Sequence, residues 1–428
     1  MINIGLLGCG TVGSGVVKLL ASNRAVISMR SGQEITIKRV LETAPHKVLD
    51  LGLGEEVLCT DINELLADED IHIVVELIGG IEPARTYILE AMKRGKHVVT
   101  ANKDLIAVCG QELFSTAETH GVDFYFEAAV GGGIPVIHPL KQYLGGNHIK
   151  EVIGIVNGTT NYILTKMSRE GMEFNQVLRE AQELGYAEAD PTSDVEGYDA
   201  ARKIAILASI AFNSRVTLDD VYVEGITRLS PLDIEYGGEL GYVVKLLAIA
   251  QEIKGRIQAR VHPAFIPKHH PLAAVNGVYN AVFINGDAVG ELMFYGRGAG
   301  QMPTASAVVG DIMEIARNIH RGTVGSVSCT CFYSKDIMPI DELQSKFYIR
   351  LLVKDRPGVL AAIAGVFGNH QVSIATVLQK TSGEEYARLV LVTHYVPESD
   401  LRDALTVLEG MSIVSEISNV IRLEGETR

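Results

Sequence analysis

The most constraining feature of the sequence is a glycine-rich turn next to the amino terminus. The apolar run Ile2–Leu7 leads into G-C-G-T-V-G at residues 8–13, and a helical pattern follows. A strand, a G-x-G-x-x-G turn and a helix in this order are typical of a dinucleotide-binding unit. Gly8 would make the tight turn, Gly10 would let backbone N–H groups reach a pyrophosphate, and Gly13 would let helix and strand pack closely. An unliganded turn in an α/β sheet is the alternative.

The alternation of short apolar runs and helical segments continues to about residue 134. Further strand-like runs stand at Ile35–Leu41, Ile71–Ile78, His97–Thr100 and Val122–Phe126. Strands that alternate with helices predict a parallel, doubly wound sheet. We therefore expect residues 1–134 to form a Rossmann-like α/β domain that binds NAD or NADP.

The end of the second strand bears on the choice between these two cofactors. The strand reads I-T-I-K-R-V-L-E, with Lys38 and Arg39 before Glu42. An acidic side chain there would bind the ribose 2′-hydroxyl, and an arginine would accept a 2′-phosphate. The basic pair favours NADP modestly, and NAD stays open.

Ligands of open α/β sheets lie beyond the carboxyl ends of the strands. Three segments of this sequence stand there, namely Gly79–Gly80, Thr100–Lys103 and the glycine run 131–133. Gly80 could bring backbone close to a cofactor, and the glycine run suits a loop that crosses between domains. A lysine at a helix start is usually a surface residue, but its place at the end of a strand makes Lys103 a candidate.

A second group of candidates lies in residues 182–212. Ser193 and Glu196 have the spacing of a capping box, and helical periodicity predicts a helix over Val195–Ala211. Lys203 would lie on the apolar face of this helix. A lysine on such a face must be neutral, paired or functional.

Carboxylates surround this lysine in the sequence. Asp199 precedes Lys203 by one helical turn, and Glu188 and Asp194 lie just upstream. A surface i,i+4 ion pair is the simpler interpretation of the spacing between Asp199 and Lys203. The apolar neighbours and the extra carboxylates favour a site that binds an ammonium group and protonates an oxyanion.

The rest of the chain divides into three parts. Residues 135–320 alternate less regularly and predict an α+β substrate and dimerisation domain, in which the glycine-rich loop 296–305 opens a helix and could contact a phosphate or nicotinamide. Residues 321–346 are interpreted as a linker. Residues 347–428 follow the order βαββαβ, which is a ferredoxin-like arrangement.

Composition limits the partners and the compartment. The net charge is −14 without a block of Lys and Arg, so a nucleic-acid partner is not expected. No apolar run approaches the roughly 20 residues that span a bilayer, and no secretory signal is seen. Five scattered cysteines, an odd number at low density, predict reduced thiols in the cytoplasm.

Segments from most of the chain resemble the homoserine dehydrogenase family. Six motifs match in the same order: GLLGCGTVGSGVV, HVVTANKDLIA, YFEAAVGGGIPVI, GIVNGTTNYILTKM, ELGYAEADPTSDVEGYDAARKIAIL and MFYGRGAGQMPTASAVV. D-R-P-G-V-L at 355–360 and N-H-Q-V-S-I at 369–374 resemble an ACT regulatory domain. Such domains usually pair across subunits and bind amino acids at the shared edge.

The resemblance implies an activity and roles for residues. The family interconverts L-homoserine and L-aspartate 4-semialdehyde with NAD(P), a step toward threonine, methionine and isoleucine. Glu188 and Asp199 would bind the substrate, with Asp194 in support. Lys203 would donate the proton to the reacting oxygen, and Lys103 would lie beside the nicotinamide.

The remaining sites combine the motifs above with the resemblance. The cofactor contacts expected from the motifs are Gly8, Gly10, Thr11, Val12, Gly13, Arg39, Gly80 and Thr100, and the resemblance adds Lys103, Gly185 and Gly300. A sodium-like monovalent cation would be held, mostly through backbone carbonyls, at Glu127, Val130, Gly132 and Ile134, which suits the preference of hard cations for oxygen. An effector, with L-threonine the first candidate, would bind at Gly358 and Asn369 of a homodimer or homotetramer.

Two alternatives remain open from the sequence. Another Rossmann oxidoreductase of amino-acid metabolism, such as an aspartate-semialdehyde dehydrogenase, would need a nucleophilic cysteine, and residues 182–212 contain none. A non-catalytic amino-acid sensor would use only the carboxyl-terminal unit. The presence of both Lys103 and Lys203 argues against the sensor.

Overall fold

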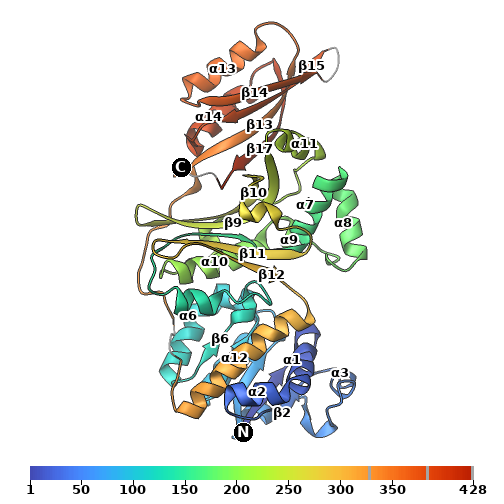
Figure 1. Ribbon diagram of the computed structural model, residues 1–428, viewed down its shortest axis with the longest axis vertical. Coiled ribbons are helices and arrows are strands. Elements are labelled where there is room, and N and C mark those ends of the chain that lie inside the picture. The colour runs from blue at the N-terminus through green and yellow to red at the C-terminus, as the bar shows by residue number, and fades with distance from the viewer. Residues whose placement is uncertain (326–328, 382–384, 426–428) are drawn as a thin grey trace.

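The fold is seen in a computed structural model that describes residues 1–325, 329–381 and 385–425. Figure 1 shows three stacked units, with the amino-terminal residues in blue at the bottom, residues of the middle of the chain in green and yellow, and the carboxyl-terminal residues in orange and red at the top. This mixed α/β architecture is the one that the sequence predicts.

The lowest unit contains a six-stranded parallel sheet with the order β3-β2-β1-β4-β5-β6. Its strands are β1 (Ile2–Leu7), β2 (Ile35–Leu41), β3 (Leu58–Cys59), β4 (Ile71–Glu76), β5 (His97–Thr100) and β6 (Phe124–Tyr125). Its helices are α1 (Thr11–Ser22), α2 (Arg24–Ser31), α3 (His46–Leu49), α4 (Ile62–Ala67), α5 (Ala84–Lys93) and α6 (Lys103–His120), with the 3₁₀ turn η1 (Glu55–Val57). The strand order is that of a Rossmann-like sheet, which confirms the prediction.

One helix of this unit comes from much later in the chain. Helix α12 (Gln301–Arg321) lies beside α1 and α2 in Figure 1 and buries Val308 and Ile312 in the same core as Ile4. A Cβ on Gly15 would lie only 2.6 Å from the carbonyl oxygen of Gln301, so glycine is needed where α1 and α12 meet. The chain therefore returns to the first unit, which the contiguous division at residues 134 and 320 did not anticipate.

The middle and upper units share one sheet of eleven strands, in the order β12-β11-β7-β9-β10-β17-β13-β15-β14 with β8 and β16 beside β10 and β13. The strands are β7 (Ile149–Ile155), β8 (Val221–Val223), β9 (Tyr242–Ile253), β10 (Arg256–Pro267), β11 (Tyr279–Gly286), β12 (Gly290–Arg297), β13 (Gln344–Lys354), β14 (Ile374–Thr381), β15 (Tyr386–Thr393), β16 (Val396–Pro397) and β17 (Val414–Leu423). The sequence analysis missed β9 and β12.

The middle unit contains five helices among the described residues. They are α7 (Gly158–Glu170), α8 (Phe174–Glu183), α9 (Thr192–Val195), α10 (Tyr198–Ala211) and α11 (Pro231–Glu239), with short turns at η2 (Glu127–Ala129), η3 (Pro139–Tyr143), η4 (Leu218–Asp220), η5 (Pro271–Ala274) and η6 (Ile340–Glu342). Three of these helices, α7, α9 and α10, border the site described below. The prediction of one capped helix over Val195–Ala211 is wrong. Gly197 has a φ of 87°, which ends α9 and starts α10, and neither helix has a side-chain cap.

The upper unit has the predicted βαββαβ order, with α13 (Val359–Asn369) and α14 (Glu398–Glu409) packed on its strands. It has its own hydrophobic core, which includes Phe347, Ile363 and Phe367. It nevertheless continues the middle sheet, because β17 pairs in parallel with β10 through Ala264–Arg422 and Phe265–Leu423.

A buried carboxylate fastens the upper unit to the middle one. Asp233, in the first turn of α11, has no exposed surface and accepts hydrogen bonds from Arg350, Tyr348 and Asn419 of the upper unit. The Arg350 Nε lies 2.6 Å from the Asp233 Oδ1. Burial by itself would raise the pKa of Asp233, but Arg350 and Asn419 lower it below its usual value.

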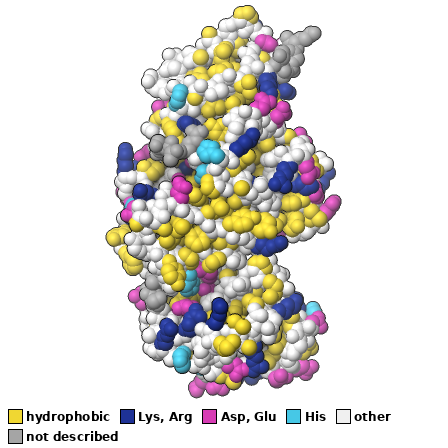
Figure 2. All heavy atoms as spheres, in the orientation of Figure 1, with side chains coloured by type: hydrophobic (Ala, Val, Ile, Leu, Met, Phe, Trp, Pro, Cys, Tyr) yellow, Lys and Arg dark blue, Asp and Glu magenta, His cyan; other side chains and the backbone are white. Residues whose placement is uncertain are grey.

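The passage before β13 joins the units with little regular structure. In the described part of 321–346, Tyr333 forms a single bridge with Ser214 and Ile337 forms one with Ile257, while residues 326–328 lie outside the described chain. Within the described residues, no helix combines the length and apolar composition that crossing a bilayer requires. Figure 2 shows basic and acidic side chains interspersed on the visible face, with hydrophobic side chains gathered over the middle of the molecule.

The junction at Asp233 generates a first prediction. Arg350→Ala should lower the free energy of unfolding by about 3 kcal/mol, because it leaves a buried carboxylate without its cation. Arg402→Ala is the control, since Arg402 pairs with Asp341 at an exposed site where water screens the charges, and the variant should lose much less stability than Arg350→Ala. Urea denaturation measures both values, and equal losses would show that the Asp233 pair does not fasten the units.

Candidate functional site

A cavity of about 540 Å³ lies where the first unit meets the middle unit. It is bordered by the start of α6, the glycine run after β6, the start of α7, the loop before α9, helix α10 and the start of α12. The predicted site residues that line it are Lys103, Gly132, Gly185, Glu188, Asp194, Asp199, Lys203 and Gly300. The fold thus brings together candidates that are nearly 200 positions apart in the sequence.

Asp199 is the centre of the polar network in this cavity. Its Oδ2 lies 2.7 Å from the Lys203 Nζ and 2.8 Å from the Asn157 Nδ2, and its Oδ1 lies 3.3 Å from the Lys103 Nζ. The Lys203 Nζ also donates to the carbonyl oxygen of Val156 at 2.7 Å. The pair of Asp199 and Lys203 does have the i,i+4 spacing, but the two side chains are only 8% and 13% exposed, so it is not a surface ion pair.

The two aspartates of the cavity differ in their environments. Burial alone would raise the pKa of Asp199, but Lys203 and Lys103 lower it to about 2, so this carboxylate stays charged. Burial raises the pKa of Asp194, and the neighbouring charge of Asp199 adds to this effect. The cavity therefore holds one fixed anion between two cations, and a second acid that is easier to protonate.

Asn157 joins these two aspartates, and the sequence analysis did not single it out. Its Nδ2 donates to the Asp194 Oδ1 at 2.7 Å as well as to Asp199. Its Oδ1 accepts the N–H of Thr160 at 2.9 Å and so caps α7. An N-x-x-T sequence directly after a strand is an N-cap signal that could have identified it.

The glycine-rich turn has the shape that a pyrophosphate requires. Gly8 has a φ of 91°, and a Cβ on Gly13 would lie 2.2 Å from the Gly8 carbonyl oxygen. Nothing lies within 4 Å of a Cβ built on Gly10, the N-cap residue of α1, so this helix start is open to a ligand. Thr11 and Val12 form the first turn of α1, where backbone N–H groups are unsatisfied. These residues fit a dinucleotide.

The side chains at the end of β2 separate into different roles. Glu42 is buried and accepts the backbone N–H groups of Cys9 and Ala44 at 2.9 and 3.0 Å, so it fixes the glycine-rich turn. Lys38 turns away and pairs with Asp68 and Asp70. Arg39 donates from Nη1 to the carbonyl oxygen of Glu56, while its Nε has no partner in the described part of the chain.

Gly80 and Thr100 lie at the same edge of the sheet but outside the cavity lining. Thr100 donates its hydroxyl to buried Glu76 at 2.6 Å, and Glu76 also accepts the N–H groups of Ile78 and Gly79. The carbonyl oxygen of Gly80 accepts from the Asn102 Nδ2 at 2.6 Å. Glu76 and Asn102, which the sequence analysis did not single out, therefore shape this loop.

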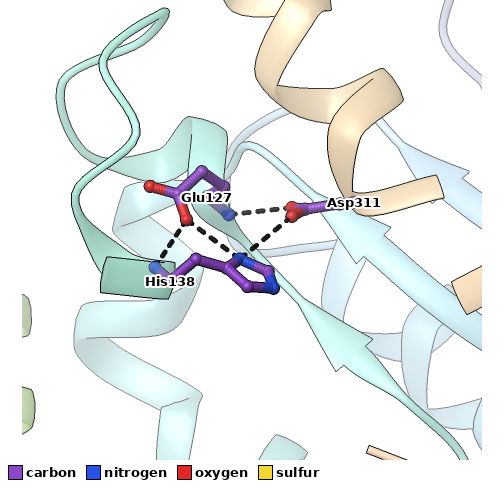
Figure 3. Close-up of side chains that lie close together, drawn as sticks. All are labelled: Glu127, His138 and Asp311. Carbon is purple, nitrogen blue, oxygen red and sulfur yellow. Dashed lines mark hydrogen bonds and ion pairs between the residues drawn. The ribbon is translucent and has the colours of Figure 1, made fainter. Parts of the chain in front are cut away.

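Glu127 lies behind the cavity in a cluster with His138 and Asp311, which Figure 3 shows as side chains that point toward one another. The Glu127 carboxylate accepts backbone N–H groups of Val136, Ile137 and His138 and the His138 Nδ1. Asp311 on α12 accepts the N–H of Glu127 at 2.9 Å.

Ionisation in this cluster is strongly perturbed. Burial and the charge of Glu127 raise the pKa of Asp311 to about 8. Burial opposes protonation of His138, but Glu127 and Asp311 raise its pKa above the usual value. Hydrogen bonds already occupy the Glu127 carboxylate, so the cluster serves to brace α12 against the crossing loop.

Asn280 is a further cavity residue that the sequence analysis missed. It is 1% exposed, and its Oδ1 has no hydrogen-bond partner among the described residues. A Cβ on Gly298 would lie 2.0 Å from the Asn280 Nδ2, so glycine at 298 makes room for this amide. A buried acceptor without a donor at the cavity wall suits a bound ligand that carries an N–H or O–H group.

A parallel sheet with a pyrophosphate-shaped turn, next to a cavity that holds two lysines around one buried carboxylate, defines a dinucleotide-dependent oxidoreductase of a small polar substrate. The family models agree with this class. Residues 8–127 match "Homoserine dehydrogenase, NAD binding domain", residues 135–313 match "Homoserine dehydrogenase" and residues 347–411 match "ACT domain".

Comparison with individual proteins points to the same family. The homoserine dehydrogenase of Synechocystis sp. is 49% identical over 99% of both chains, and that of Bacillus subtilis is 45% identical over 99% of this chain and 98% of the other. The crystal structure of a homoserine dehydrogenase from Thiobacillus denitrificans, 42% identical, has a TM-score of 0.94 over 99% of this chain and 98% of the other. The chain belongs to the homoserine dehydrogenase family and is an NAD(P)-dependent oxidoreductase with a carboxyl-terminal ACT domain.

The network around Asn157 generates a prediction on stability. Asn157→Ala removes a donor to Asp194 and Asp199 and the cap of α7, and should cost about 1–3 kcal/mol at neutral pH. Losing the donor raises the folded-state pKa of Asp194 further, so the cost should shrink as pH falls and Asp194 becomes protonated.

Urea denaturation at neutral pH and at about pH 5 measures this change. Asn102→Ala is the matched control, because Asn102 caps α6 in the same way but its side chain bonds to no carboxylate among the described residues. Its cost should not depend on pH. The same pH-independent cost for Asn157→Ala would show that this amide acts only as a helix cap.

Proposed function

We propose that the cavity catalyses the reversible interconversion of L-homoserine and L-aspartate 4-semialdehyde, with Lys203 as the proton donor. The observation that carries this proposal is the placement of the Lys203 ammonium. It is largely buried, paired with Asp199 and directed along the wall of a cavity next to the dinucleotide turn. When bound, the nicotinamide supplies the hydride for aldehyde reduction or accepts it from homoserine.

Lys203 keeps one donor for the substrate. An ammonium group has three N–H donors, and the contacts with Asp199 and the Val156 carbonyl use two of them. The third has no partner in the described chain and can meet the substrate oxygen. Negative charge develops on that oxygen during reduction, so a donated proton lowers the barrier, and the same nitrogen takes the proton back in the oxidation of homoserine.

Lys103 is the second cation at the reacting oxygen. Its Nζ lies 3.3 Å from the Asp199 Oδ1, opposite the oxygen that Lys203 contacts. It comes from the first turn of α6, directly beyond strand β5 of the dinucleotide sheet. This position supports a role in stabilising the oxyanion beside the nicotinamide.

Glu188 and Asp194 are the carboxylates that we assign to the substrate. Glu188 is exposed at the cavity and forms no ion pair with a described side chain, so its charge is free to bind an ammonium group. Asp194 is held by Asn157, and Asp199 completes the acidic side of the cavity. This arrangement suits an amino acid substrate.

Backbone of the glycine-rich turn, from Gly8 to Gly13, would hold the pyrophosphate, with Gly80, Thr100, Gly185 and Gly300 around the rest of the cofactor. Arg39 is the cation that stays available near the end of β2, which supports NADP over NAD. A hyperthermophilic archaeal homoserine dehydrogenase, 30% identical over 73% of this chain and 97% of the other with a TM-score of 0.63, is described in complex with NADPH. Initial rates with NAD and NADP decide the preference.

A sodium-like cation is proposed at the loop after β6. Gly131 and Gly132 have φ values of 74° and 55°, which turns the backbone sharply. The carbonyl oxygens of Val130, Gly132 and Ile134 accept no hydrogen bond in the described structure. Together with the carbonyl of Glu127 they offer the oxygen ligands that hard cations prefer.

The ACT domain is proposed to bind an amino acid between subunits, with L-threonine as the effector. Gly358 and Asn369 lie at opposite ends of α13, and eleven residues of helix span about 16 Å. One small ligand can therefore touch both only if they come from two chains. Exposed Met293 and Tyr295 on the edge strand β12 also support an oligomer, a homodimer or homotetramer.

Each part of the chain would have its own function. Residues 1–134 would bind the cofactor, 135–320 the substrate and the partner subunit, 321–346 would link, and 347–428 would regulate. A place in the biosynthesis of threonine and methionine follows from the reaction. A reducing, cytoplasmic compartment is supported by five cysteines that form no disulfide.

Lys203→Ala should lower kcat by about two to four orders of magnitude, the effect of removing a positioned acid or base. The affinity for NADPH should change little, because Lys203 faces the substrate. Absorbance at 340 nm follows turnover with homoserine and NADP, and NADPH fluorescence follows binding. Lys166→Ala is the control, because Lys166 pairs with Glu170 and Glu180 outside the cavity. Turnover near that of the control would make Lys203 a structural residue.

Glu188→Gln removes the charge that we assign to the substrate ammonium. KM for homoserine should rise about tenfold or more, as expected for a lost hydrogen bond between charged groups, while KM for the cofactor stays the same. Glu183→Gln, an exposed residue at the end of α8, is the control. An increase confined to the cofactor KM would instead place Glu188 in the nucleotide site.

Threonine should inhibit the wild-type enzyme, and Asn369→Ala should weaken inhibition while leaving turnover without threonine unchanged. A coupling of about 1–3 kcal/mol between effector and substrate would suffice. Titration with threonine while the rate is measured tests this prediction. Equal inhibition of both proteins would place threonine in the active site as a substrate mimic.

A further inference from the structure

A second, smaller cavity lies next to the helices that carry the two lysines. Ile106 of α6 and Ile206 of α10 both line it, and each follows its lysine, Lys103 or Lys203, by three residues. Its remaining wall includes the segment 329–331, which follows α12 in the chain. Nothing in the proposed reaction uses this cavity.

Two thiols, those of Cys329 and Cys331, line this wall. Cys329 and Cys331 are separated by Thr330, and the N–H of Phe332 donates to the Thr330 carbonyl at 2.9 Å, which bends the backbone at Cys331. Cys331 is therefore the titratable neighbour nearest to Cys329 in the chain, and both thiols line the same cavity. Both cysteines are partly exposed, whereas Cys9 and Cys59 are buried.

Two cations lie in the same cavity. The Lys141 Nζ lies 5.6 and 5.5 Å from the ring centres of Phe114 and Phe126, and it has no carboxylate at ion-pair distance in the described chain. The Arg215 guanidinium also lines the cavity and donates to the carbonyls of α6. A thiolate is the anion that is available to these cations.

The electrostatics distinguish Cys329 from the other cysteines. The neighbouring Cys331 side chain lowers the pKa of Cys329, aided by Lys141 and Arg215 and opposed by burial. The pKa of Cys331 is raised by the neighbouring Cys329 side chain. Burial raises the pKa of Cys9, Cys59 and Cys109, so these thiols stay protonated.

We propose that Cys329 is a reactive thiol and Cys331 its resolving partner, so that the pair forms an intrachain disulfide by exchange with a small-molecule disulfide such as oxidised glutathione. The Cys329 thiolate attacks one sulfur of that disulfide, and one glutathione leaves as a thiolate. Cys331 then loses its proton to solvent and attacks the Cys329 sulfur, which releases the second glutathione. Two electrons pass from the cysteine pair to the small disulfide.

The site is placed to act on turnover. Ile106 and Ile206 contact the same cavity as the thiol pair, one turn from Lys103 and Lys203. A bond between the two sulfurs shortens their separation and shifts the segment against both helices. Oxidation should therefore lower kcat more than it changes cofactor binding.

Alkylation of the full-length protein tests reactivity without a variant. Iodoacetamide, followed by peptide mapping across a pH series, should label Cys329 first and at a lower pH than Cys109. In Cys331→Ala the labelling of Cys329 should need a higher pH than in the wild type, because alanine removes the neighbouring thiol that favours the thiolate. Labelling of Cys329 no faster than Cys109 would overturn the proposal.

Oxidised glutathione tests the second step. The intact mass of the wild-type protein should fall by the mass of two hydrogen atoms, which indicates a disulfide. In the Cys331→Ser variant the reaction should stop at the glutathione adduct of Cys329. A wild-type protein that stops at the adduct, or takes up none, contradicts the role of Cys331. Turnover is measured before and after oxidation and again after reduction with dithiothreitol, and a disulfide that leaves kcat unchanged would refute the effect on the lysine helices.

Discussion

The cavity depends on one buried negative charge, that of Asp199. Removing a carboxylate from water costs much free energy unless cations and hydrogen-bond donors replace the water. Lys203 comes from the same helix, Lys103 from α6 of the dinucleotide unit, and Asn157 from the start of α7. Because these groups belong to different units, the need to compensate Asp199 also holds the cofactor side and the substrate side of the cavity together.

The long-range packing gives this network its fixed position. Helix α12 returns to the first unit and is braced by Asp311 against Glu127, while its first residues border the cavity. The eleven-stranded sheet extends from the cavity into the ACT domain, and Asp233 with Arg350 fastens the junction. The ACT domain is therefore connected to the catalytic unit by a continuous sheet and not only by a linker.

Local sequence patterns predicted much of this structure, because strand periodicity and glycine-rich turns are determined by residues that are close together in the sequence. Five of the six parallel strands, the turn at 8–13 and the charged residues of the cavity follow from such patterns, whereas the two-residue strand β3 was too short to be predicted. Strand β9 was missed because the run Y-V-V-K-L-L-A-I-A suits a buried helix as well as a strand, and only its pairing with β10 decides. The helix break at Gly197 could not be predicted, because it depends on the close approach of Gly197 to Val223 and Val261, which are distant in the sequence. The hydrogen bond from the Cys9 N–H to Glu42 could not be predicted either, because it joins the ends of two neighbouring strands.

A double-mutant cycle between Asp199 and Lys203 tests whether the buried carboxylate acts by holding the lysine in place. The rate of aldehyde reduction is measured for wild type, Asp199→Asn, Lys203→Ala and the double variant. If Asp199 acts by holding Lys203, Asp199→Asn should lower the rate strongly in the wild-type background. The same substitution should lower the rate little in the Lys203→Ala background, and the coupling energy between the two residues should be about 1–3 kcal/mol. Effects that simply add would contradict the account, because they would mean that the carboxylate and the lysine act independently.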